Sequence, residues 1–231
     1  MALTMSFYEA EEKITEEMLK PLQKHYDNES TPSEISMLMH QIKENSSTYK
    51  VYRIAKMVDK NFPVYKIEDD TIIPEEDELK VWETHYAYIK LNSKSIYVSG
   101  SGAGWVSGFI SNIIFKDDTK IKLVEINTKG LEEDIRKSKK FTPTGASFVD
   151  EEQTKVTIKN PSGLDFETNK YMKDISEIDK DRIDIIIQKD DLNIIVFVYP
   201  QGKVTFQGYT RDKDTTLRIF LKIWNEIKEY H

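Results

Sequence analysis

The chain has 231 residues, a formal net charge of −7 and no cysteine. Its 39% hydrophobic and 32% charged residues are typical of a folded globular protein, not a disordered one. These values exclude disulfides, thiolate metal sites and cysteine nucleophiles, and they disfavour a protein that wraps nucleic acid over much of its surface. We find no secretory signal and no apolar run long enough to span a membrane, so we expect a cytoplasmic protein without membrane contact.

Two helices are predicted at the start of the chain. The first runs from about Ser6 to Tyr26, where apolar residues recur at the helical period. The second begins at Thr31, because Thr31 and Glu34 form a capping box with a proline at the first helical position. We therefore expect an N-terminal helical hairpin over residues 1–47, packed on a main domain of residues 48–231.

Strand-forming residues dominate from Tyr49. Residues 49–57 and 62–68 are predicted strands, and the acidic run 75–78 after Pro74 predicts a short helix. The next segments predict a hairpin with its turn at 92–94 and a helix over 105–115. A strand at about 120–127 is expected to follow this helix.

The last third of the chain gives the clearest pattern. A charged helix at 130–140 and a strand at 155–159 come before three strands joined by short turns, which predict an antiparallel meander, and a closing helix at 215–230. The predicted fold class is α+β. We expect the helical hairpin, a mixed or antiparallel sheet flanked by helices, the three-strand meander and a packed terminal helix.

The stretch SGSGAGW at 99–105 leads from a predicted strand into a predicted helix. A dinucleotide site would need G-x-G-x-x-G in a parallel sheet, with Glu125 on the ribose, and neither the spacing nor the hairpin context fits. The favoured interpretation is a sharp turn that glycine permits. The start of the helix is also a possible anion-binding turn, formed by Gly100, Ser101, Gly102 and Gly104.

A basic run is the best local candidate for contact with phosphate. The run contains Arg136, Lys137, Lys139 and Lys140. The fold could bring Lys129, Arg211 and Lys213 close to it. The alternative is the solvated face of a charged helix. Neither the histidines nor the triplet of Asp118, Lys120 and Glu125 makes a convincing metal or nuclease site, so we predict no catalytic residue, metal or cofactor.

The ordered segments YKVYRI, FPVYKIE, HYAYIKLNSKSIYVSG, KIKLVEIN, TKVTIKN and RIDIIIQ, over residues 49–190, resemble the family of the Rex A phage-exclusion protein and the Kiwa B subunit. The resemblance consists of hydrophobic pattern and order without a diagnostic motif. It implies a protein without recognised catalytic residues that associates with DNA and with itself. No site residue is transferred by it.

Three functions follow from these observations. The leading hypothesis is a non-catalytic, self-associating protein of phage exclusion or antiphage defence that contacts DNA or a DNA-processing partner. The second is an enzyme or sensor that binds a nucleotide at the Gly100–Gly104 turn. The third is a protein–protein adaptor without a ligand.

Overall fold

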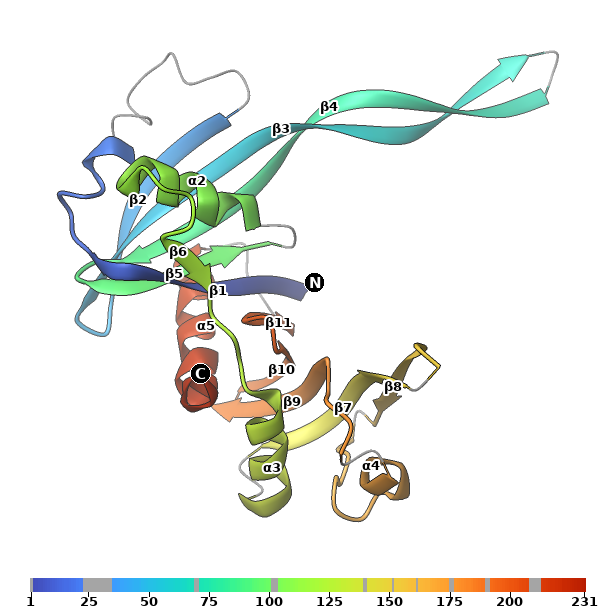
Figure 1. Ribbon diagram of the computed structural model, residues 1–231. Helices are drawn as coiled ribbons and strands as arrows, with labels where there is room; N and C mark the ends of the chain where they lie inside the picture. The colour runs from blue at the N-terminus through green and yellow to red at the C-terminus, as the bar shows by residue number, and fades with distance from the viewer. Residues whose placement is uncertain are drawn as a thin grey trace.

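The computed structural model describes residues 2–22, 35–68, 71–100, 104–138, 141–150, 152–160, 162–174, 177–189, 192–207 and 213–231 (Figure 1). The strands form one 11-stranded sheet in the order β2-β3-β4-β5-β1-β11-β10-β9-β7-β8, with β6 beside β1. All pairings between the described strands are antiparallel.

The first strands of the sheet are β1 (Ala2–Ile14), β2 (Ile35–Glu44), β3 (Ser47–Glu68), β4 (Thr71–Lys90), β5 (Ser93–Ser99) and β6 (Ile121–Leu123). The remaining strands are β7 (Thr142–Val149), β8 (Lys155–Lys159), β9 (Arg182–Lys189), β10 (Leu192–Tyr199) and β11 (Lys203–Gln207). The helices are α2 (Gly104–Phe115), α3 (Thr128–Ser138), α4 (Lys170–Asp174), α5 (Lys213–Ile227) and the 3₁₀ helix η1 (Lys228–Tyr230).

The predicted first helix is wrong, because residues 2–14 form β1 at the middle of the sheet. β1 pairs with β5 on one side and with β11 and β6 on the other. Met5 and Phe7 belong to one hydrophobic core, whereas Tyr8 and Ala10 belong to a second core. A strand buried on both faces lacks the alternation of apolar and polar residues that marks a half-buried strand, and its apolar residues matched a helical period by coincidence.

The second helix and the α+β fold class are also wrong. Residues 35–44 form β2, which pairs with β3 over its whole length, and residues 74–82 lie within β4 instead of forming a short helix. The capping box at 31–34 lies outside the described residues. Half of the chain is strand, in one antiparallel sheet, and the described residues of 1–47 contain two strands of this sheet instead of a helical hairpin. Long-range pairing with β3 overrode the local signals for helix.

The C-terminal meander and helix are confirmed. β9, β10 and β11 pair in succession, and their buried residues belong to the same core as those of α5. Helix α5 lies beside these strands in Figure 1. Phe220 of α5 packs against Phe7 and Tyr97 at ring-centroid distances of 4.9 and 5.1 Å. Trp224 stacks on Phe7 at 3.9 Å. These aromatic contacts join the last helix to the two central strands.

Helix α2 covers the second core, on the opposite face of the sheet. Its residues Val106, Ile110 and Ile113 pack with buried residues of β1, β3, β4 and β5. The predicted helix over 105–115 and the hairpin that precedes it are confirmed. The hairpin turn has Asn92 in the left-handed region, with φ of 56°.

The turn between β10 and β11 packs closely against the chain that follows β6. Gly202, between β10 and β11, has φ of +58°, and a Cβ there would overlap the carbonyl oxygen of Val124. The Phe7 amide donates to Gly202 O, and the Val124 amide donates to Phe7 O. Glycine is therefore required at position 202 for two reasons: the backbone is left-handed there, and no space is left for a Cβ.

Strands β3 and β4 continue far beyond their neighbours as a twisted two-stranded ribbon that projects from the rest of the molecule (Figure 1). β3 pairs with β2 only as far as Lys56, and β4 pairs with β5 only from Ala87. We call residues 57–68 and 71–82 the arm, and the rest of the described residues the body.

Candidate functional site

The chain leaves β5 at Gly100, which has φ of +101°. A Cβ at this position would lie 2.5 Å from His85 Nδ1, so glycine is needed both for the bend and for the contact with His85. The Gly100 amide donates to Thr4 O in β1. Gly104 begins α2, whereas Ser101 and Gly102 lie outside the described residues. These contacts favour the interpretation of this stretch as a sharp turn.

His85 lies beneath this turn and is only 2% exposed. Its Nδ1 donates a hydrogen bond to Ser99 O at 2.7 Å, because a carbonyl oxygen can only accept. Its Nε2 lies 3.4 Å from Glu83 Oε1, which is an ion pair when the imidazole is protonated. Within the described part of the chain, Nε2 has no hydrogen-bond partner.

Trp105, the second residue of α2, carries an unused donor. Its ring meets His85 edge-on at 5.7 Å, and its buried Nε1 has no hydrogen-bond partner among the described residues. Lys56 Nζ lies 5.9 Å from the centre of the Trp105 ring. Lys56 is exposed and stands opposite Glu83 in the β3–β4 ladder. We call Lys56, Glu83, His85, Gly104 and Trp105 the α2 cluster.

The chemistry of the α2 cluster suits an anion better than a reaction. An indole N–H, a lysine ammonium and the unpaired amides of a helix's first turn are all donors or positive charges. Glu83 is the one carboxylate among the five residues, and it already lies beside His85. No group of three potential metal ligands occurs in the described residues. The arrangement can hold a phosphate or carboxylate oxygen at the start of α2.

Arg136 and Lys137, the two members of the basic run whose side chains are described, both have carboxylate partners. Arg136 is largely buried, and its guanidinium donates to Glu132 Oε1, to Phe166 O and to Met172 O, the last two at 2.6 and 3.0 Å. Lys137 is exposed and forms an ion pair with Glu133 one turn away. These contacts use the Arg136 guanidinium to join α3 to residues 166–172.

The other predicted phosphate contacts remain predictions. Lys129 is exposed near the start of α3. Lys139, Lys140 and Arg211 lie outside the described residues, as does the side chain of Lys213, whose backbone begins α5. The structure therefore brings none of these cations together into a described patch.

A buried ion pair beside Arg136 had no signal in the sequence. Lys180 Nζ lies 3.3 Å from Glu132 Oε2, and both side chains are almost fully buried. Burial lowers the pKa of Lys180, although the Glu132 carboxylate opposes this effect. Glu132 is thus shared by Lys180 and Arg136, which come from distant parts of the chain. No spacing rule links residues 48 positions apart, so only the fold reveals this pair.

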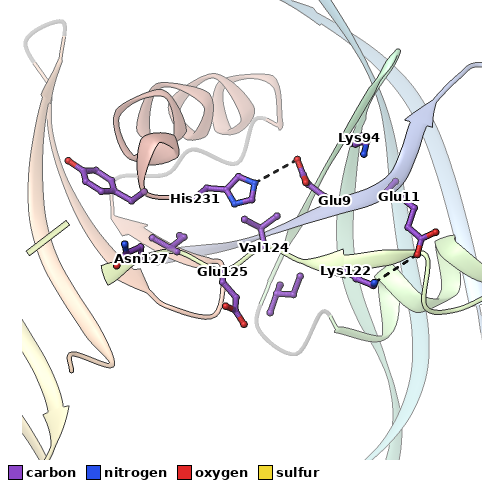
Figure 2. Close-up of a pocket in the computed structure, with 12 residues that line it drawn as sticks. Glu9, Glu11, Lys94, Lys122, Val124, Glu125, Asn127 and His231 are labelled. Atoms are coloured by element: carbon purple, nitrogen blue, oxygen red, sulfur yellow. Dashed lines mark ion pairs between the residues drawn. The ribbon is translucent and has the colours of Figure 1, made fainter. Parts of the chain in front are cut away.

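Figure 2 shows the largest cavity among those described, an open hollow of about 980 Å³ between β1, β6 and the end of the chain. Glu9 and Glu11 lie on one side of it, with Glu9 Oε1 3.8 Å from His231 Nε2. Glu11 pairs with Lys120 at 2.7 Å, and this hydrogen bond lowers the pKa of Glu11. Carboxylates and cations are mixed around this hollow, so it offers no concentrated charge to a ligand.

Glu125 lines this hollow, and no residue of the glycine turn does. The turn follows an antiparallel hairpin strand, and β6 pairs antiparallel with β1. The parallel strands that a dinucleotide fingerprint requires are thus missing at this turn. The structure argues against Glu125 as a ribose ligand for the glycine turn.

Comparison with known proteins adds no relative. No protein-family model matches the chain, and no curated protein matches it significantly. None of the described helices is long and apolar enough to cross a membrane. Function must therefore be argued from the site itself.

Proposed function

We propose that the protein is a non-catalytic binding protein that holds a small phosphate-bearing ligand, such as a nucleotide, at the α2 cluster. The observation that carries the proposal is the buried Trp105 Nε1, a donor without a partner among the described residues, at the start of a 12-residue helix. An unpaired buried donor costs about 1–3 kcal/mol. A ligand oxygen that accepts from it would recover that free energy.

Three further features support an anionic ligand. Lys56 supplies a full positive charge beside the Trp105 ring. The first turn of α2 supplies backbone amides and the positive end of the helix dipole. His85 meets the Trp105 ring edge-on and so helps to position the indole donor.

A small ligand suits the surroundings better than a long nucleic acid. The arm begins directly after Lys56 and is acidic, so a polyanion that extended past the cluster would meet repulsion. A role in phage exclusion or antiphage defence, with self-association, remains a proposal that rests on the resemblance to Rex A and the Kiwa B subunit. The open edge strands β2 and β8 at the two ends of the described sheet favour self-association, because an open edge can pair with another strand.

The test is a thermal-unfolding screen with inorganic phosphate, nucleoside mono-, di- and triphosphates and a 20-nucleotide single strand. A ligand present at 100 times its Kd stabilises the folded state by about 2.7 kcal/mol, so binding raises the Tm. We expect Lys56→Gln and Trp105→Phe each to weaken binding of the active compound at least about fivefold. Trp105→Phe retains the aromatic ring and removes the N–H donor.

Lys137→Gln is the matched control, because Lys137 is an exposed cation on α3, outside the α2 cluster. It should bind as the wild type does. The proposal fails if no phosphate compound raises the Tm, or if both cluster variants bind normally. Binding of the single strand that is lost in Lys137→Gln would instead assign nucleic-acid contact to α3.

A further inference from the structure

The arm exposes an unusual share of the molecule's apolar surface. Seven large hydrophobic side chains are exposed among the described residues, and four of them lie in the arm: Phe62, Tyr65, Leu79 and Trp82. Tyr65 is 65% exposed and Trp82 47%. Beyond Lys56, no described strand pairs with either outer edge of the ribbon. Such a concentration of exposed apolar side chains in one element is characteristic of an interaction site.

The exposed residues lie on both faces of the ribbon. Phe62 stands opposite Asp77, which places Phe62 on the same face as Leu79. Tyr65 stands opposite Pro74, which places it on the other face, the same face as Trp82. A ribbon that binds through both faces fits into a groove better than onto a flat surface.

Most of the chain's negative charge is concentrated in the same segment. Residues 57–82 contain eight Asp or Glu and three Lys, a net charge of −5 out of −7 for the whole chain. The remaining 205 residues therefore carry only −2. This asymmetry determines which partners the arm can approach, because like charges repel and opposite charges steer association.

Charge excludes three of the possible occupants. Nucleic acid and anionic lipid would be repelled by the arm. A second copy of the chain would bring another segment 57–82, with a net charge of −5, against the first, and the rest of that copy is acidic as well. What remains is a protein surface that is basic and has apolar pockets.

We propose that the arm is a docking element that inserts into a basic, partly apolar groove of a partner protein. The length of the arm, twelve residues per strand, gives it a reach of about 40 Å. Phe62, Leu79, Tyr65 and Trp82 fill the apolar pockets, and the arm's carboxylates pair with lysines and arginines of the groove. The proposal is independent of the α2 cluster.

The test uses three fluorescent 16-residue peptides as probes, measured by anisotropy with the full chain. The first alternates Lys or Arg with Leu and Trp, the second replaces Leu and Trp by Ser, and the third replaces Lys and Arg by Glu. We expect the first to bind most tightly, the second at least about tenfold more weakly, and the third not at all. Binding of the first should weaken as salt is raised.

Two arm variants and one body variant show whether the peptide binds the arm specifically or binds any acidic surface of the protein. Glu75→Gln/Glu76→Gln/Glu78→Gln and Phe62→Ser/Trp82→Ser should each weaken binding of the first peptide at least about tenfold. Glu12→Gln/Glu17→Gln/Glu133→Gln removes three carboxylates at exposed positions of the body and should change binding less than twofold. Circular dichroism of every variant confirms that the sheet is intact.

Three results would overturn the proposal. The first is equal weakening by the body and arm charge variants, which would make the binding non-specific. The second is the absence of binding by the first peptide. The third is a concentration-dependent dimer in sedimentation that the arm variants abolish, which would show that a second copy occupies the arm.

Discussion

The C-terminal meander and the arm are built from the same kinds of residues, yet they differ in what covers them. In the meander, Ile185, Val196 and Val204 are fully buried beneath α5. In the arm, Phe62, Tyr65 and Trp82 also lie on strands, but they remain in contact with solvent. Strand formation therefore depends on local sequence and pairing, whereas burial depends on whether another element is placed over the strand.

The two regions have different roles in the molecule. The meander closes a core with β1, β5 and α5, so its packing determines the stability of the fold. The arm adds backbone ladder bonds, and none of its described side chains is buried, so its sequence is free to serve binding. Four pairs of variants test this division.

The largest difference should come from removing one phenylalanine in each region. Phe220→Ala leaves a cavity between Phe7 and Tyr97, and we expect a loss of about 3–5 kcal/mol in the free energy of unfolding. Phe62→Ala in the arm should change it by no more than about 0.5 kcal/mol. Urea unfolding measures both. Similar losses for the two variants would mean that the arm is covered in solution.

A glycine substitution tests the junction between the meander and β6. Gly202→Ala forces an L residue into a left-handed conformation and drives its Cβ into Val124 O, so we expect a loss of about 3 kcal/mol. Gly108→Ala is the matched control, because it lies inside α2, where a Cβ meets only Asp118 O at 4.0 Å. It should stabilise the protein by about 0.5–1 kcal/mol. An unchanged free energy of unfolding for Gly202→Ala would show that Gly202 and Val124 O do not lie this close together.

The third change concerns the basic run on α3. Arg136→Met removes the hydrogen bonds to Phe166 O and Met172 O and should cost about 2 kcal/mol. Lys137→Met breaks only an exposed pair with Glu133 and should cost no more than about 0.5 kcal/mol. Chemical denaturation of the two variants measures both losses in the free energy of unfolding. Equal costs would mean that Arg136 is as exposed to solvent as Lys137.

The smallest effects depend on pH and come from two carboxylates near the start of β9. Burial raises the pKa of Asp184, and Arg182 offsets only part of this effect. Its contribution to stability is complete below the ordinary pKa of the group and is lost as pH rises through the folded-state pKa. Burial also raises the pKa of Asp181, but hydrogen bonds from Lys155 and Ser147 outweigh it, so the net pKa is lowered. That contribution is present above the ordinary pKa and is lost as pH falls.

Unfolding free energies between pH 3 and pH 7 check these signs. The difference between wild type and Asp184→Asn should decrease as pH rises, whereas the difference between wild type and Asp181→Asn should increase. Parallel slopes for the two variants would contradict the assigned environments.

The sequence predicted the elements whose signals are local. The hairpin at 92–94, helix α2 and the meander with α5 each rest on turn residues or on one clear period, and all were confirmed. The N-terminal helices failed because β1 is buried on both faces and β2 is determined by its pairing with β3. The acidic run 75–78 suited a helix start equally well, and only its pairing across the ribbon with residues 61–64 makes it a strand.

The candidate site was predicted only in part. The glycine turn and the helix after it were found, because glycine spacing and helical period are written in consecutive residues. Lys56, Glu83 and His85 were missed as members of the site, since they join Trp105 only through the β3–β4 ladder. The internal hydrogen bonds of Arg136 were not predicted, because the carbonyl oxygens of Phe166 and Met172 leave no mark in the sequence.

Hydrogen–deuterium exchange of the full chain tests the division between body and arm most directly. Amides of β9, β10 and β11 should exchange only through global unfolding, because their ladder lies beneath α5. Amides of residues 57–68 and 71–82 should exchange much faster, at a rate independent of protein concentration. Protection of the arm equal to that of the meander would contradict the account, because it would show that the arm is already covered.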